Sequence, residues 1–302
     1  MVVTQPRIEE LADGVFAYIQ PDGGWCLSNA GVLVSRGATA LVDTAATVAR
    51  TLALRDAVRT VAAAPPRLVV NTHSHGDHTF GNFLFAPEAV IVSHARARVE
   101  LVAVGLHLTG LWPEVEWGEI TLAPPSVTFD ERLTLHVGDK RVELLHTGPA
   151  HTTGDVVVWL PEERVLFAGD LVMAGATPFC MMGSITGSLR TVERLRALGP
   201  RIVVPGHGPV GGPELLTDTE GYLRRVRAIA RAGIAAGSSP LQAAREADLG
   251  TYGALLDSER LVPNLHRAYA EERGAAPGAP LDVETLFGEM VEHHGGLPAC
   301  HA

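Results

Sequence analysis

The chain has 302 residues, a hydrophobic content of 46% and a formal net charge of −10. This length predicts one large domain, or one domain with an extension, and the apolar content is ample for a buried core. Lys140 is the only lysine and no basic block occurs, which argues against a nucleic-acid-binding protein. The N-terminal residues lack a signal-peptide pattern, and no apolar run approaches the length of about 18 residues that a membrane span needs. We therefore expect a cytoplasmic protein without a membrane partner.

Apolar and alternating stretches predict an α/β protein in two parts. Strands are expected at residues 8–11, 15–19, 30–34, 38–42, 68–70, 89–92, 126–129, 133–137, 142–146, 155–160, 165–168 and 202–204. Helices are expected between them at residues 47–63, 96–104 and 188–198. After Gly211 only helical patterns remain, at residues 215–236, 240–247, 258–270 and 281–294. We therefore expect an α/β core at residues 1–212 and a helical extension at residues 213–302.

The densest group of polar side chains follows the buried strand at residues 68–70. His73, His75, Asp77 and His78 fall within six residues of one another. Imidazoles and a carboxylate in this number suit zinc or a neighbouring first-row metal. Gly76 lies among them and allows a tight turn, so that side chains on both sides of it can converge. The alternative is a polar loop that carries surface histidines.

Three later strands each lead to a single residue of the same chemical type. His151 follows the strand at residues 142–146 after a Gly-Pro turn, Asp170 follows the strand at 165–168, and His207 follows the strand at 202–204. Rigid strands with functional loops at one edge commonly bring such side chains together. One histidine after a turn is weak evidence, but the ordered set predicts a single metal site.

The H-x-H-x-D-H motif and the three ordered residues resemble the metallo-β-lactamase superfamily over roughly residues 8–210. The resemblance implies an αββα sandwich of the metallo-β-lactamase type. It implies that one metal is held by His73, His75 and His151, and the second by Asp77, His78 and His207, with Asp170 bridging the two. Asp77 and Asp170 would also be the catalytic carboxylates. These ligands favour two zinc ions, without excluding iron or manganese.

The resemblance also places two groups around the metals. Asp43 would orient a ligand histidine, the alternative being a cap for the next helix. Trp25 would overhang the site and cover an apolar substrate, the alternative being a tryptophan packed on the sheet edge. Apart from the resemblance, the apolar, Met-rich segment at residues 171–184 directly follows a ligand. It is expected to line the substrate site with Phe179, Met181 and Met182, or else to fill the core.

His94 and a group of arginines have interpretations that do not involve metal binding. His94 lies outside the ligand pattern and is expected to be a cap or loop residue. On the helix at residues 215–236, four arginines crowd one side, namely Arg224, Arg225, Arg227 and Arg231. This basic stripe predicts either a docking surface for an acidic partner such as an acyl carrier protein, or a solvated face. The sequence leaves oligomerisation open.

Within the superfamily, residues 24–31, 73–82 and 167–184 most resemble the aromatic (type II) polyketide cyclase/thioesterases, such as second-ring cyclases of the actinorhodin type. This implies a dinuclear zinc enzyme that acts on a carrier-protein-bound aromatic polyketide. The reaction would be aldol ring closure, thioester hydrolysis or both. One alternative is a glyoxalase II-like thioester or lactone hydrolase. Another is a metal-binding partner subunit without catalysis.

Overall fold

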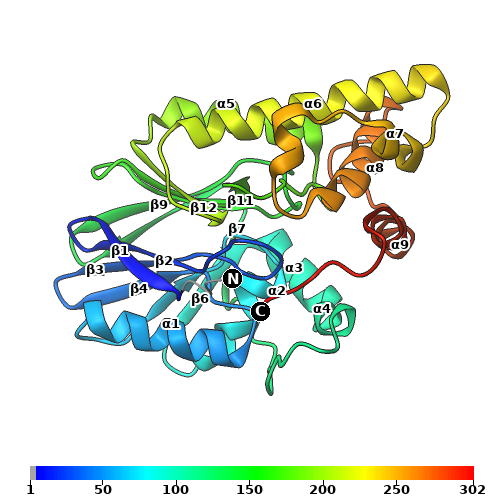
Figure 1. Ribbon diagram of the computed structural model, residues 1–302. Helices are drawn as coiled ribbons and strands as arrows, with labels where there is room; N and C mark the ends of the chain where they lie inside the picture. Colours follow the sequence, from blue (N-terminus) through cyan, green and yellow to red (C-terminus); the bar gives the residue numbers. More distant parts are fainter. Residues whose placement is uncertain (1–4) are drawn as a thin grey trace.

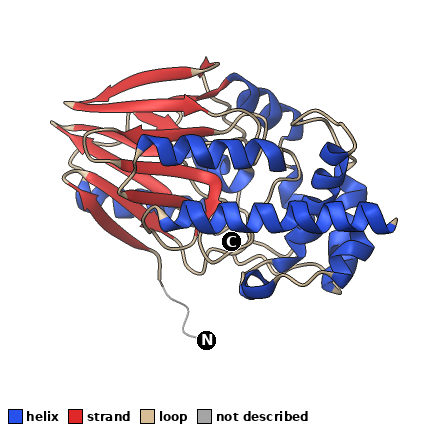
Figure 2. Ribbon diagram, turned by 90° about the horizontal axis from the view of Figure 1, so that it is seen from above, coloured by secondary structure: helices blue, strands red, loops and turns tan. Residues whose placement is uncertain are grey.

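The computed structural model describes residues 5–302 and shows two β-sheets packed face to face, with helices on both outer faces (Figures 1 and 2). The first sheet has seven strands in the order β1-β2-β3-β4-β5-β6-β7, and the second has five in the order β12-β11-β10-β9-β8. This layering, with helices at the C-terminal end, confirms the fold class expected from the sequence.

The strands fall close to the expected residues. They are β1 (Arg7–Ala12), β2 (Val15–Ile19), β3 (Ala30–Ser35), β4 (Ala38–Val42), β5 (Leu68–Val70), β6 (Val90–His94), β7 (Val127–Phe129), β8 (Arg132–Val137), β9 (Lys140–His146), β10 (Val156–Leu160), β11 (Val165–Met173) and β12 (Ile202–His207). In the first sheet, β1 to β4 pair antiparallel and β4 to β7 pair parallel. In the second, β11 and β12 are parallel and the other pairs are antiparallel.

The helices cover the two outer faces and continue beyond them. They are α1 (Val48–Val61), α2 (Gly76–Thr79), α3 (Ala95–Val104), α4 (His107–Leu111), α5 (Ile185–Leu198), α6 (Glu214–Ala236), α7 (Pro240–Glu246), α8 (Leu261–Glu272) and α9 (Val283–His294), with the 3₁₀ helices η1 (Phe80–Leu84), η2 (Gly250–Ala254) and η3 (Ser258–Arg260). Leu54 and Val58 of α1 pack on the first sheet, while Val192 and Leu195 of α5 pack on the second. None of the helices in the described residues is long and apolar enough to span a membrane.

The strand that carries Asp170 differs from the expectation. The sequence predicts that β11 ends before Asp170, but the strand continues to Met173 and Asp170 lies inside it. The pairing of β11 with β12 shifts register on both sides of Gly169, whose φ is +52°. Such an irregularity lets a strand continue while it redirects a side chain, and hydrophobic pattern alone does not reveal it. The expected loop at residues 171–184 therefore begins after Met173.

The long helix α6 belongs to two packing layers. Near its N-terminus, Leu216 packs with α5 and the second sheet. Farther along, Leu223 and Val226 pack with Leu261 and Leu265 at the start of α8. Figure 1 shows α6 lying beside α5 and then running past it towards α7 and α8. The proposed boundary at residue 212 thus falls just before a helix that joins the core to the C-terminal helices.

The core between the sheets contains one very close approach that glycine permits. A Cβ added to Gly31 of β3 would lie 2.5 Å from the ring of Phe167 on β11, and Phe167 is almost fully buried. We expect Gly31→Ala to lower the free energy of unfolding by about 1–3 kcal/mol, because a well-packed core resists an added methyl group. Urea unfolding followed by circular dichroism measures this change.

The matched control is Gly110→Ala in α4, where an added Cβ meets no atom within 4 Å. This change should leave stability unaltered or raise it by up to about 1 kcal/mol, since alanine is the better helix former. Equal effects at the two positions would contradict the close packing of β3 against β11.

Candidate metal centre

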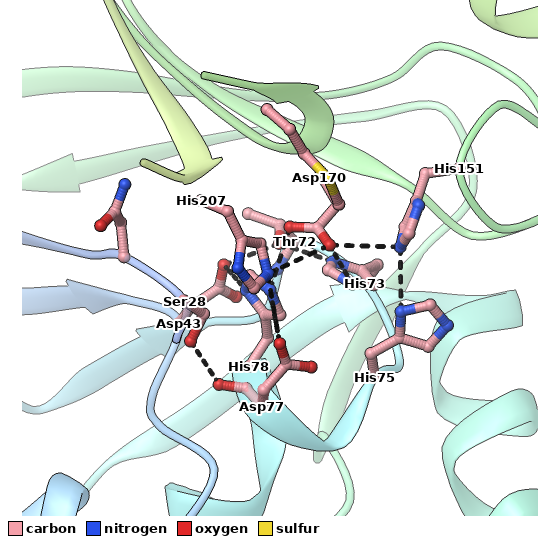
Figure 3. A network of polar contacts seen from close by, with 12 residues as sticks. Ser28, Asp43, Thr72, His73, His75, Asp77, His78, His151, Asp170 and His207 are labelled. Atoms are coloured by element: carbon pink, nitrogen blue, oxygen red, sulfur yellow. Dashed lines mark hydrogen bonds and ion pairs between the residues drawn. The ribbon is translucent and has the colours of Figure 1, made fainter. Parts of the chain in front are cut away.

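The side chains of all seven predicted ligands meet at one edge of the sandwich (Figure 3). They form two groups. The first contains His73, His75, His151 and Asp170, the second contains Asp77, His78 and His207, and within each group one ligand atom per residue lies within 4.8 Å of the others. All are buried except His75, which is partly exposed. The convergence expected from the order of strands and loops is therefore present in the fold.

After β5, residues 71–75 lead into the short helix α2, which begins at Gly76. A Cβ on Gly76 would lie 2.4 Å from the ring of Phe80, so this position accepts only glycine without a shift of the ring. The turn places His73 and His75 before α2, whereas Asp77 and His78 lie within it. One short segment thereby supplies ligands to both groups.

Asp170 lies between the two groups. Its Oδ2 is 3.4 Å from Nε2 of His151 in the first group and 3.5 Å from Nε2 of His207 in the second. Its Oδ1 is 3.0 Å from Nε2 of His78. Oδ2 of Asp77 is 3.2 Å from the same nitrogen of His207. A single carboxylate thus faces donor atoms of both groups, as a bridging ligand would.

Several of these atoms are buried without a hydrogen-bond partner. In residues 5–302, they include Nε2 of His73, and also Nε2 of His78 and Oδ1 of Asp170, which lie 3.0 Å apart without the alignment of a hydrogen bond. Nδ1 of His75 and Nε2 of His151, by contrast, lie within hydrogen-bond distance of each other, at 2.9 Å. Buried polar atoms normally have partners, so unsatisfied atoms that point into one small volume fit a bound cation. Imidazole nitrogens and carboxylate oxygens are the donors that zinc and similar divalent cations bind, and the residues present fit such ions.

Asp43 fixes two of the ligand histidines. Its Oδ2 accepts a hydrogen bond from Nδ1 of His78 (2.9 Å) and another from the hydroxyl of Thr72 (2.7 Å), and its Oδ1 accepts from the amide of Thr72 (2.7 Å). The Thr72 oxygen in turn faces Nδ1 of His73 at 3.0 Å. With Nδ1 as donor, Nε2 of each ring keeps its lone pair for a metal. The helix cap considered as the alternative for Asp43 is instead Thr47.

Backbone carbonyls orient two more ligands. Nδ1 of His151 donates to the carbonyl of Phe179 (2.5 Å), and Nδ1 of His207 donates to the carbonyl of Gly24 (3.2 Å). These contacts again leave Nε2 free to face the centre. Because the acceptors are main-chain atoms, their role depends on how the two loops are held.

The charges of the two groups differ. Burial lowers the pKa of His73 and of His75, and it lowers that of His151 to about 3, so these rings are neutral at pH 7. Burial also acts on His207, but the carboxylates of Asp170 and Asp77 outweigh it and raise the pKa to about 9. Protons on the histidines of the second group therefore balance the negative charge of the buried carboxylates. A bound cation would replace these protons.

The sequence did not indicate Glu100 of α3, which joins the two loops of the first group. Its Oε2 accepts from the hydroxyl of Ser74 (2.8 Å), between His73 and His75. Its Oε1 accepts from the hydroxyl and the amide of Thr153, two residues beyond His151. Nothing in the pattern of a surface helix distinguishes this glutamate from its exposed neighbours.

The predicted substrate residues form an apolar cluster beside the first group. The ring centroid of Phe179 lies 6.2 Å from that of His151 and 5.5 Å from that of Trp25. Trp25 and Met182 are partly exposed, whereas Phe179 is 6% and Met181 is 3% exposed. The burial of Met181 and Phe179 is what the core-filling alternative expects, whereas Trp25 and Met182 are partly exposed. Substrate contact by all four residues stays a prediction.

His94 and the arginines of α6 have partners within the protein. His94 caps α3 by accepting from the amide of Arg96 at 3.1 Å, as expected. The four arginines of the basic stripe contact Glu220, Glu272 and the carbonyl of Asp248. These contacts neutralise part of the stripe, and docking of an acidic partner stays a prediction.

Comparison with known proteins identifies the family. Residues 23–207 match the model of the metallo-beta-lactamase superfamily. A type 2 metallo-beta-lactamase of Bacteroides fragilis is 28% identical over 222 residues, covering 70% of this chain and 83% of that protein. The acyl-coenzyme A thioesterase MBLAC2 of Bos taurus is 31% identical over 186 residues, covering 54% of this chain and 64% of that protein. The solved metallo-beta-lactamase from Pontibacter korlensis superimposes with a TM-score of 0.60 at 24% identity, covering 73% of this chain and 99% of that one.

The chain belongs to the metallo-beta-lactamase superfamily, because the family model spans more than half of it and includes all seven predicted ligands. Members of this superfamily are metallo-hydrolases that typically bind two metal ions, often zinc. The fold and the candidate site together define a metal-dependent hydrolase of this class.

We expect Asp43→Asn to weaken binding of the ion at the second group by about 10–100-fold, because the carboxylate orients His78. Asparagine tolerates the positive φ of +61° at this position, so the backbone should be preserved. Competition with a chromophoric chelator measures the affinity. Asp139→Asn, which alters an exposed ion pair with Arg36, is the control. Unchanged affinity in Asp43→Asn would contradict the proposed orientation of His78.

Glu100→Ala should weaken the ion at the first group instead, by about 10–100-fold, because the loops that carry His75 and His151 lose their common anchor. The same chelator competition applies, with Glu88→Ala at an exposed ion pair as the control. A loss confined to the second group would show that Glu100 does not act on the first.

Proposed function

We propose that the protein is a metal-dependent thioesterase that hydrolyses acyl thioesters with a bulky, apolar acyl group. One observation carries the proposal: Asp170 lies between the two ligand groups, and the ring of Phe179 lies beside His151 of the first group and next to the ring of Trp25. A polar centre able to hold two cations next to an apolar surface suits a substrate with a reactive carbonyl at one end and a hydrophobic chain at the other.

The chain would hold the ions through the seven ligands described above. When bound, two divalent cations would supply an activated water molecule and polarise the acyl carbonyl. The chain's own part is to hold Nδ1 of the ligand rings through Asp43, Phe179 and Gly24, so that Nε2 of each ring is aimed inward. The partly exposed His75 marks the side on which the site meets solvent and substrate.

The buried thiols are poor candidates for an alternative nucleophile. Burial raises the pKa of Cys180 to about 12, and contact with Cys300 together with burial raises that of Cys26 well above its ordinary value. A protonated thiol is unreactive towards an ester. Attack by water is therefore the simpler route, and a thiolate leaving group with a pKa of about 8.5 needs little help from an acid.

Similarity to an acyl-coenzyme A thioesterase supports the thioester. The apolar cluster supports a hydrophobic acyl chain, since Phe179 lies in it with Met173 and Leu286, and the partly exposed Trp25 packs against it. A glyoxalase II-like enzyme, by contrast, acts on a small polar acyl group, which this surface fits less well.

Ring closure on a carrier-bound aromatic polyketide is the second candidate. It is favoured by aromatic side chains near the same site, where the partly exposed ring of Trp25 lies 5.5 Å from the buried ring of Trp112. Flat polycyclic substrates stack on such rings. Hydrolysis and ring closure would use the same centre, so the acyl group offered to the enzyme distinguishes them.

Hydrolysis of a matched series of thioesters tests the proposal. Zinc-loaded protein is incubated with coenzyme A esters from acetyl to palmitoyl, with lactoylglutathione, and with a carrier-bound aromatic polyketide, and thiol release and products are measured. We expect kcat/KM for coenzyme A esters to rise by at least about tenfold between the shortest and the longer chains, as burial of several methylene groups allows.

Chelated protein and Asp170→Asn are the inactive controls, and Asp139→Asn is the active one. Turnover of lactoylglutathione alone would overturn the apolar acyl substrate in favour of the glyoxalase II type. Ring closure without release of thiol would favour the cyclase, and no turnover by protein that binds two ions would favour a non-catalytic subunit.

A further inference from the structure

The C-terminal helices touch the loops that orient two metal ligands, one in each group. The relevant acceptors are the carbonyl of Gly24, which binds His207, and the carbonyl of Phe179, which binds His151. Gly24 lies in the loop before β3, and Phe179 lies in the loop between β11 and α5. Neither carbonyl is in a regular strand or helix, so something else must hold it.

The first loop is held by η3. The indole Nε1 of Trp25, next to Gly24, donates to Oε1 of Glu259 at 2.7 Å. The guanidinium carbon of Arg260 lies 4.0 Å from the centroid of the Trp25 ring, and Arg260 is only 1% exposed. A Cβ added to Gly24 would lie 3.6 Å from Oδ1 of Asp257, just before η3. Thus η3 contacts Trp25, and Asp257 just before η3 lies near Gly24, whose carbonyl His207 uses.

The second loop is held by α8. The side chain of Asn264, which is fully buried, accepts from the amide of Cys180 at 2.8 Å and donates to the carbonyl of Pro178 at 2.7 Å. These two residues flank Phe179. Arg260 also donates to the carbonyl of Thr177 at 3.0 Å. The carbonyl of Phe179 is therefore bracketed on both sides by hydrogen bonds from the C-terminal part of the chain.

Burial gives these contacts their strength. Glu259 is 4% exposed and Arg260 is 1% exposed, so their partners are shielded from water. A buried charged group is stable only where its hydrogen bonds and ion pairs are made, and removing one partner leaves the other unsatisfied. Glu259 and Asn264 therefore restrict both loops to one arrangement.

We propose that Glu259 and Asn264 are positioning residues of the metal centre, one for each ligand group. Glu259 acts on His207 through the loop at residues 24 and 25. Asn264 acts on His151 through the carbonyl of Phe179. The inference rests on the proposed function because it requires a bound metal. It assigns the C-terminal helices a role in positioning the metal ligands.

The test measures metal binding by the full chain, without substrate. Chelator competition gives two stepwise dissociation constants for zinc, and the visible spectrum of the cobalt-substituted protein reports ligand geometry. The variants His151→Ala and His207→Ala assign each constant to a group. The test variants are Glu259→Ala, Glu259→Gln and Asn264→Ala.

We expect Glu259→Ala to weaken the ion of the second group by about 10–100-fold, and Asn264→Ala to weaken the ion of the first by a similar factor. Each variant should leave the other ion within about threefold and change the cobalt spectrum. Glu259→Gln should restore affinity and spectrum, because its amide oxygen can still accept the hydrogen bond from Trp25.

The control Leu265→Ala removes a buried apolar side chain of α8 and distinguishes a purely structural role from a positioning role. This control should lower Tm without altering either dissociation constant. The inference is overturned if Glu259→Ala and Asn264→Ala behave like Leu265→Ala, or if each weakens both ions equally.

The inference and the proposed function fail in different ways. If the unmodified chain binds two ions but hydrolyses no thioester, the proposed function fails and the variants still decide the inference. If the thioester is hydrolysed and the variants leave both affinities unchanged, only the inference fails. If the unmodified chain binds no ion, both are wrong.

Discussion

The structure depends on one electrostatic constraint, the burial of two carboxylates among five imidazoles. Asp170 is 6% exposed and Asp77 is 7% exposed, and nearby histidines hold the pKa of each carboxyl below its ordinary value despite burial. Ionised carboxylates in so little water need compensating positive charge. Divalent cations would supply it while also giving partners to ring nitrogens that make no hydrogen bond.

The fold meets this constraint by delivering donors from distant parts of the chain and fixing each by a separate contact. The short segment after β5 supplies four ligands, and β11, β12 and the loop after β9 supply one each. Asp43, the Phe179 carbonyl and the Gly24 carbonyl then set which ring nitrogen faces inward. The C-terminal helices extend this support, since they contact both loops that carry the carbonyls. Core and extension thereby contribute to one centre.

Much of this centre could be predicted from the sequence because its signals are local. The spacing from His73 to His78 and the apolar strands before His151 and His207 are visible in a single chain. The position of Asp170 inside β11 was not, because it depends on a register shift against β12. Periodicity reports burial and does not report strand pairing.

The supporting contacts were predicted less well, for a different physical reason. The role of Asp43 followed from resemblance, but Glu100 looks like any surface glutamate until α3 is placed beside both loops. The carbonyls of Gly24 and Phe179 carry no side-chain signal at all. The sequence likewise could not show that the arginines of α6 pair with glutamates of other helices, such as Arg227 with Glu272. Each of these contacts exists only through tertiary structure.

The central claim is that the seven side chains hold two ions, and metal stoichiometry tests it most directly. Purified full-length protein is loaded with zinc, freed of excess metal by gel filtration, and analysed by mass spectrometry for metal per chain. Two ions per chain in the parent and fewer in Asp170→Asn are the predicted result. Less than one ion per chain in the parent, under loading conditions that saturate a known dinuclear enzyme, would contradict the account.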